Sequence, residues 1–148
     1  MKTLVIACLA CVALVPPARA DDKAEAVKKE LEKLQGEWQL VSAERNGKKI
    51  PDNQFNDEKT TIKGDVETVI KGGKVMQTAK LTLDPTTSPK TYTREVTDGV
   101  NKGSKTHGIY ELNDDAFTEC RIAADKERPK LLSSKNGALL MVSKRAKP

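Results

Sequence analysis

The pattern of apolar and polar residues changes period at Gly36. Before it, apolar residues recur at spacings of three and four, which predicts a helix over 22–34 with one apolar face. Asp21 or Asp22 can cap the start of this helix, and Gly36 can end it. After Gly36, short segments rich in Thr, Val, Ile and Leu alternate with turn signals about every ten residues, which is typical of a β-sandwich or a β-barrel.

These segments predict eight or nine β-strands. The strongest hairpin signals are Asn46-Gly47, Gly72-Gly73 and Asn136-Gly137, because tight hairpins need positive φ angles at their centre. A Pro-containing loop is expected over 50–57. The predicted strands cover residues 37–45, 59–63, 66–71, 74–83, 90–97, 106–112, 116–123 and 138–145, with 130–133 as a short additional strand.

A closed barrel explains the composition better than a two-sheet sandwich. A sandwich core usually contains more aromatic volume than the five rings of this chain, Trp38, Phe55, Tyr92, Tyr110 and Phe117. Closing the sheet also removes exposed edges that could recruit other chains. We therefore predict an all-β fold, a small antiparallel up-and-down barrel of about eight strands with an N-terminal helix. A barrel of that size is either filled by side chains or holds one small ligand.

Three residues mark the closed end of such a barrel. Gly36 and Trp38 begin the first strand, and Arg145 ends the last one. A large ring can fill the narrow end, and a guanidinium stacked on it gains a cation–π contact. We therefore expect these three residues to close the barrel.

The Gly-x-Trp and C-terminal Arg pattern resembles that of lipocalin-like barrels, and a wider set of segments resembles one family. The chain is similar to the uncharacterised exported lipocalin-like domain family that is expanded in planctomycete bacteria. The resemblance covers essentially everything after residue 20, and it implies the fold and an extracytoplasmic setting but no catalytic residues. The matching segments are Leu34–Glu44, Asn46–Lys48, Ile50–Pro51, Leu83–Pro85, Gly108–Leu112, Lys126–Pro129 and Ser133–Ser134.

The first twenty residues read as a signal peptide. Lys2 precedes an apolar run over 4–15, Pro16-Pro17 breaks the run, and Ala18-Arg19-Ala20 is a cleavage signal. Two alternatives are a buried N-terminal helix and a lipoprotein anchor at Cys8 or Cys11. The predicted organisation is a signal peptide over 1–20, a helix over 21–35 and a lipocalin-like barrel over 36–148, in a protein exported to the periplasm or the extracellular space.

Charge and cysteine content narrow the range of partners. The formal net charge of +5 falls by two when Lys2 and Arg19 leave, and basic and acidic residues are interspersed, so we predict no nucleic-acid partner. No second apolar run is long enough to cross a bilayer, so no transmembrane segment is expected in the mature chain. Cys120 is then the one remaining cysteine. It is either buried or a dimerising thiol, and we predict a buried thiol and a monomer.

Catalytic and metal-binding patterns are not found in the sequence. His107 is the only histidine, so a histidine-rich metal site is excluded, and nothing resembles a nucleophile elbow or an oxyanion loop. A Cys120–His107 pair on adjacent strands is a remote alternative. The Asp/Gly/Asn-rich segment 98–103 lacks the alternating carboxylates of a calcium loop and reads as a turn. We predict no enzyme activity, no metal and no cofactor.

Strand alternation indicates four candidate ligand-binding residues, Tyr92, Arg94, Tyr110 and Arg121. An inward-facing Arg beside a Tyr suits an anionic head group, because the guanidinium pairs bidentately with a carboxylate. A change of register by one residue would instead turn the charges into solvent, where they could pair with Glu95 or Glu119. We favour this second arrangement.

Two functions follow from these patterns. The first is an exported binding module whose barrel holds a small, partly apolar ligand. The second is a structural or interaction domain with a filled barrel, which binds another exported protein or a cell-envelope component through its surface. A pocket of several hundred Å³ in the barrel would favour the first, and a solid interior would favour the second.

Overall fold

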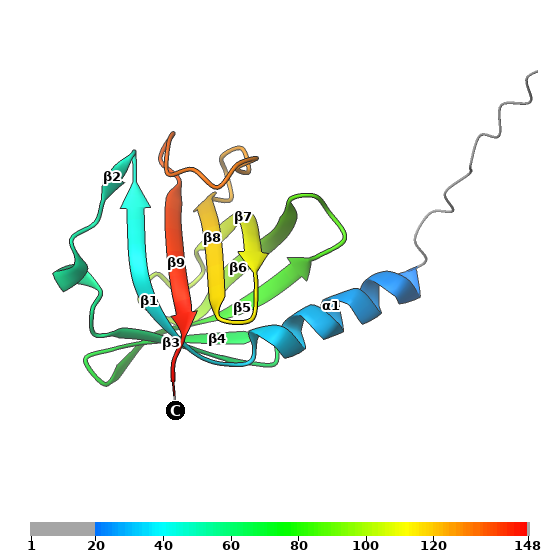
Figure 1. Cartoon of the computed structure of the whole chain (residues 1–148), viewed down its shortest axis with the longest axis horizontal. Coiled ribbons are helices and arrows are strands. Elements are labelled where there is room, and N and C mark those ends of the chain that lie inside the picture. Colours follow the sequence, from blue (N-terminus) through cyan, green and yellow to red (C-terminus); the bar gives the residue numbers. More distant parts are fainter. Residues whose placement is uncertain (1–19, 148) are drawn as a thin grey trace, which may run out of the picture.

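The computed structural model describes residues 20–147, so the predicted signal peptide lies outside them except for Ala20. Within this range the chain forms one helix, a short 3-10 turn and nine strands (Figure 1). The elements are α1 (Ala20–Leu34), β1 (Gly36–Arg45), β2 (Lys48–Lys49), η1 (Asp52–Gln54), β3 (Glu58–Lys63), β4 (Val66–Lys71), β5 (Lys74–Asp84), β6 (Lys90–Gly99), β7 (Lys105–Leu112), β8 (Ala116–Ala123) and β9 (Leu139–Arg145).

The strands form a closed antiparallel barrel. Strand β1 pairs with β3, each strand from β3 to β9 pairs with the next, and β9 pairs back with β1. The two-residue β2 is a short hairpin extension of β1 and does not belong to the closed ring. The predicted barrel of about eight strands with an N-terminal helix is therefore confirmed.

The predicted strand over 130–133 is wrong. Residues 130–133 belong to the loop between β8 and β9, where the backbone hydrogen bond of Ser133 goes locally to the Leu131 carbonyl. No strand edge is available to this segment, because β8 and β9 already pair with each other in the closed sheet. The loop predicted over 50–57 contains the single turn η1, and the other element ends differ from the prediction by one or two residues.

The C-terminal end of the helix α1 lies against one end of the barrel and closes it, while its N-terminal part extends away (Figure 1). Leu34 at its C-terminal end is fully buried, and Trp38 beneath it is only 1% exposed. The Trp38 indole nitrogen donates to the Leu34 carbonyl at 2.8 Å, which joins the helix end to the first strand. The apolar core at this end comprises Leu34, Trp38, Ile62, Leu81, Leu83, Tyr92, Tyr110 and Phe117.

A second, smaller apolar cluster lies farther along β1 and β9. Ala43 and Met141 are neighbours on paired strands, and Phe55 from the segment after η1 packs against both. Met141 also lines the barrel interior together with Leu40. The β2–β3 segment therefore adds an aromatic ring to the interior, at a distance from the helix-capped end.

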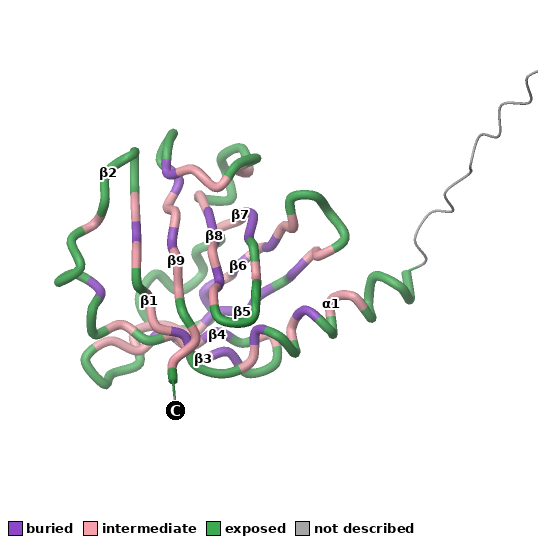
Figure 2. The backbone as a smooth tube through the Cα atoms, in the orientation of Figure 1, coloured by how far each residue is buried: buried purple, intermediate pink, exposed green. Residues whose placement is uncertain are grey.

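The β8–β9 loop, residues 124–138, covers part of the outer face of the barrel. In Figure 1 this loop and the β1–β2 hairpin lie at the end of the barrel opposite α1. Ile109, Cys120 and Ala138 form a third buried cluster. Figure 2 shows buried stretches, in purple, along β8 and β9. The Cys120 thiol is completely buried and lies 3.1 Å from the Ser133 carbonyl, to which it donates. The prediction of a buried thiol is confirmed.

Candidate functional site

The structure brings Gly36, Trp38 and Arg145 together at the helix-capped end. The Arg145 guanidinium lies over the Trp38 ring, 4.3 Å from its centroid. Its two terminal nitrogens donate to the Gln35 and Lys33 carbonyls, each at 2.8 Å, so it also caps the last turn of α1. Gly36 has a φ of +109°, a backbone conformation that suits glycine, and this turn brings the chain from α1 into β1. The arrangement is structural, because Arg145 is engaged with backbone and ring.

Arg94 and Glu67 form an ion pair inside the barrel. Arg94 Nε donates to Glu67 Oε1 at 2.7 Å, and Nη2 lies 2.6 Å from the same oxygen. The two residues are 3% and 4% exposed. Arg94 on β6 and Glu67 on β4 are separated by β5, so the two side chains reach each other across this strand. The β5 residue beside Glu67 is the buried Ala79, whose small methyl group leaves room for this contact.

A second interior ion pair lies on β8. Arg121 Nη1 is 3.1 Å from Glu119 Oε1, and both side chains are largely buried. Burial raises the pKa of the Glu119 carboxyl, and the charge of Glu67 adds to this effect, while Arg121 and Arg94 oppose it. The expectation that Arg94 and Arg121 face solvent is therefore wrong. The alternation on β6 and β8 points both side chains inward together with Tyr92 and Phe117, whose burial fixes the register.

The two tyrosines predicted with these arginines occupy different surroundings. Tyr92 lies within the ion-pair cluster, where burial and the charge of Glu119 raise the pKa of its hydroxyl well above the usual value. Tyr110 contacts Tyr92 edge to face, with ring centroids 5.9 Å apart. Its hydroxyl lies near Glu30 of α1, and burial followed by the Glu30 charge raises its pKa. Three of the four predicted residues therefore share one cluster, and Tyr110 belongs to the helix-capped end.

The cavity beside this cluster is small. Its volume is about 40 Å³, which is enough for a few water molecules. Sites for drug-sized ligands have volumes of roughly 300–1,000 Å³. This interior cavity is therefore too small for a drug-sized ligand. The cavity is lined by Trp38, Leu40, Glu58, Thr60, Ile62, Glu67, Val69, Gln77, Phe117, Glu119, Arg121, Met141 and Ser143.

Glu58 and Glu67 were not among the predicted site residues. Burial raises the pKa of the Glu58 carboxyl, although Lys71 and Arg121 oppose this shift. The signal for Glu67 was its position two residues before Val69 on one strand, which gives both side chains the same face. A glutamate in such a pattern usually points to solvent, and only the position of Arg94 shows why this one is buried.

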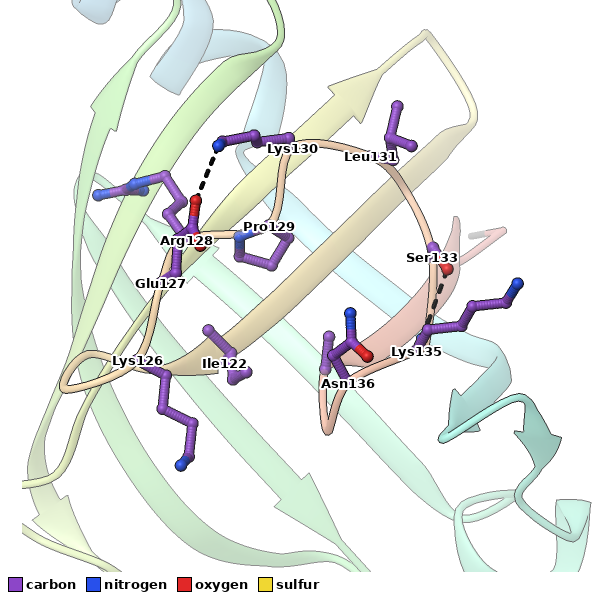
Figure 3. Close-up of a pocket in the computed structure, with 11 residues that line it drawn as sticks. Ile122, Lys126, Glu127, Arg128, Pro129, Lys130, Leu131, Ser133, Lys135 and Asn136 are labelled. Atoms are coloured by element: carbon purple, nitrogen blue, oxygen red, sulfur yellow. Dashed lines mark hydrogen bonds and ion pairs between the residues drawn. The ribbon is translucent and has the colours of Figure 1, made fainter.

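A much larger pocket lies within the β8–β9 loop. Its volume is about 520 Å³, within the range of ligand sites. Figure 3 shows the loop curving around it, with Ile122 of β8 and Pro129 facing its centre and the lysines on its rim. The pocket is lined by Ile122, Lys126, Glu127, Arg128, Pro129, Lys130, Leu131, Ser133, Lys135, Asn136 and Ala138.

The first half of this loop is held by two side-chain contacts to the barrel wall. Arg128 Nη1 donates to the Tyr92 and Gly108 carbonyls at 2.5 and 2.8 Å. His107 Nε2 lies 2.8 Å from the Lys126 carbonyl, a contact that places a proton on this nitrogen. Arg128 and His107 therefore have structural roles that the sequence patterns did not reveal.

The second half of the loop is held by the β1–β2 hairpin. Asn46 donates from its backbone nitrogen to the Ser134 carbonyl at 2.6 Å, and its side-chain oxygen accepts from Gly137 at 2.9 Å. Gly47 donates to the Ser134 hydroxyl at 3.1 Å. Both halves of the loop are thus fixed to the barrel by hydrogen bonds.

The chain matches no protein-family model, no curated protein and no solved structure. The resemblance to exported planctomycete domains therefore stays a prediction based on the sequence segments themselves. Among residues 20–147, no helix is long and apolar enough to span a membrane. In the same range, no group of three or more His, Cys, Asp or Glu side chains is arranged to hold a metal ion.

Proposed function

We propose that this chain is an exported interaction domain, in which a filled barrel serves as the scaffold and the β8–β9 loop contacts another protein of the cell envelope. The observation that supports this proposal is the contrast between the two cavities. The interior cavity beside the ion pairs has room for a few waters, while the outer loop pocket has about 520 Å³. A carrier of an internal ligand would need the opposite distribution of space.

The interior also has the chemistry of a core more than that of a ligand site. Arg94 is paired with Glu67, and Arg121 is paired with Glu119, so the cations that could receive an anionic head group are already engaged. Displacing either carboxylate would leave it buried without its partner, which is strongly unfavourable. The interior therefore acts as a structural core. In this proposal the partner protein binds at the outer surface.

Native mass spectrometry tests whether the interior holds a ligand. The mature protein would be purified from its own host without detergent, and we expect the bare polypeptide mass. An adduct of a few hundred daltons that is lost on denaturation, and that persists when the loop is altered by Leu131→Asp, would overturn the filled-barrel proposal.

Cross-linking in host envelope extracts tests the role of the loop. Leu131 lines the pocket and is 76% exposed, so Leu131→Asp should leave the fold intact. We expect a cross-linked partner with the wild type that is lost with this variant. The matched control is Val75→Asp, since Val75 is also exposed but lies on β5, outside the pocket. Equal loss with both variants, or with neither, would contradict a role of the loop.

A further inference from the structure

We propose that the β8–β9 pocket binds an acidic peptide segment carrying one apolar side chain, presented by the partner protein. The proposal rests on the proposed function, and it specifies the chemistry that the partner must supply. It is carried by two properties of the same pocket, an apolar centre and a rim of unneutralised positive charge.

The apolar centre is formed by residues from the strand and from the loop. Ile122 projects from β8, and Pro129 faces it from the loop (Figure 3). The buried Ala138 also lines the pocket, together with the exposed Leu131. An exposed leucine next to such a hollow gains free energy when another apolar group covers it. A single aliphatic or aromatic side chain of a partner fits this space.

The rim carries a net positive charge. Four basic side chains and one acidic side chain line the pocket, and the acidic one, Glu127, pairs with Lys130 at 2.7 Å. Lys126 and Lys135 have no ion-pair partner among residues 20–147, and they extend from the rim in Figure 3. Arg128 donates to backbone carbonyls and a threonine hydroxyl, so no carboxylate neutralises its charge. This excess attracts carboxylates.

The loop is already held in place before a partner arrives. Arg128 and His107 fix its first half to the barrel wall, and Asn46 fixes its second half to the β1–β2 hairpin. A partner therefore does not have to order the loop on binding, and this reduces the entropic cost of association. Isolated ion pairs on a protein surface contribute little to binding affinity. The preformed apolar centre of the pocket adds a contact that gives specificity.

Short acidic segments fit this surface better than long polyanions do. The basic side chains that line the pocket all belong to one loop, and some exposed lysines elsewhere are paired, such as Lys80 with Asp65 and Lys105 with Glu95. A long polyanion would need a continuous basic track, whereas one short segment needs only the rim of the pocket. The apolar centre further favours a segment with a side chain between its carboxylates.

Titration by NMR of the mature, isotopically labelled protein tests the proposal. The probe is a blocked heptapeptide with one leucine flanked on each side by glutamates. We expect saturable shifts of backbone amides confined to residues 122–138 and weaker binding as salt is raised, because screening reduces the attraction. Two control peptides, one with lysines for the glutamates and one with glycine for the leucine, should bind at least tenfold more weakly.

Charge-reversal variants distinguish the contribution of the rim lysines to peptide binding from that of the overall surface charge. Lys126→Glu combined with Lys135→Glu should weaken peptide binding at least tenfold. Lys74→Glu combined with Lys59→Glu makes the same change in net charge at exposed positions outside the pocket, and it should change binding less than twofold. Equal effects of the two double variants would overturn the assignment of the rim.

Two further outcomes would overturn the proposal. One is binding of decanoate at residues 122–138 with no response to the acidic peptide, which would make the pocket a small-molecule site. The other is the absence of any response to the peptide. If loop-dependent cross-linking to a partner persists in that case, the proposed function stands and only the peptide chemistry fails.

Discussion

The buried ion pair between Arg94 and Glu67 provides the sharpest test of the interior. Each side chain is almost fully buried, and their charged atoms approach to 2.6 Å. Removing one partner leaves the other charged and buried, which typically reduces stability by about 3–5 kcal/mol. We therefore expect Arg94→Met and Glu67→Gln each to lower the free energy of unfolding by about that amount.

The double variant Arg94→Met with Glu67→Leu should behave differently. Replacing a whole buried pair by apolar side chains of similar volume is often neutral, or stabilising by about 1–4 kcal/mol. We therefore expect the double variant to be at least as stable as either single variant. The nearby Glu119–Arg121 pair remains intact in all three variants.

Urea unfolding followed by far-UV circular dichroism measures these differences, since the stability falls linearly with urea. The matched control is the exposed pair between Lys105 and Glu95, whose charged atoms are 3.2 Å apart on the neighbouring strands β7 and β6. Lys105→Met should change stability by less than about 1 kcal/mol. If Arg94→Met also changes it by less than about 1 kcal/mol, the interior is hydrated and the filled-barrel argument fails.

Three other expectations address the closed end, the interior carboxylates and the thiol. Trp38→Ala should lower the free energy of unfolding by about 3–5 kcal/mol in the same assay, because the ring is buried, and a change under about 1 kcal/mol would contradict its role in closing the barrel. Burial raises the folded-state pKa of Glu58, so the native state binds more protons than the unfolded state and stability falls as pH rises from about 4 through the folded pKa. Glu58→Gln should therefore melt at a higher temperature than the wild type at pH 7, with a difference that shrinks toward pH 4, and a difference independent of pH would refute this reasoning. Burial also raises the pKa of the Cys120 thiol, so this thiol should react with thiol reagents only after denaturation. Cys120→Ser should leave the size of the protein in gel filtration unchanged.

Most of the fold was predictable because its signals are local. The spacing of apolar residues predicted α1, and the Asn-Gly and Gly-Gly pairs marked hairpins because few other residues adopt positive φ. The pairing of Trp38 with Arg145 was predictable because these residues begin the first strand and end the last strand of a ring that must close. The short strand over 130–133 was mistaken because pairing requires a free strand edge, and β8 and β9 already pair with each other.

The site depended on contacts between segments that are distant in the sequence. A shift of one residue in strand register decides whether Arg94 faces inward or outward. Its ion-pair partner Glu67, which makes the burial of Arg94 tolerable, lies two strands away in the sheet. The β8–β9 loop has no periodicity, so its position over Cys120 and its pocket follow from the contacts of Arg128, His107 and Asn46. The sequence by itself therefore determined the helix, the strands and the closure of the barrel, through local propensity and periodicity. Only the tertiary structure decided which charges are buried and where an accessible pocket lies, because both depend on the side chains that other strands bring alongside.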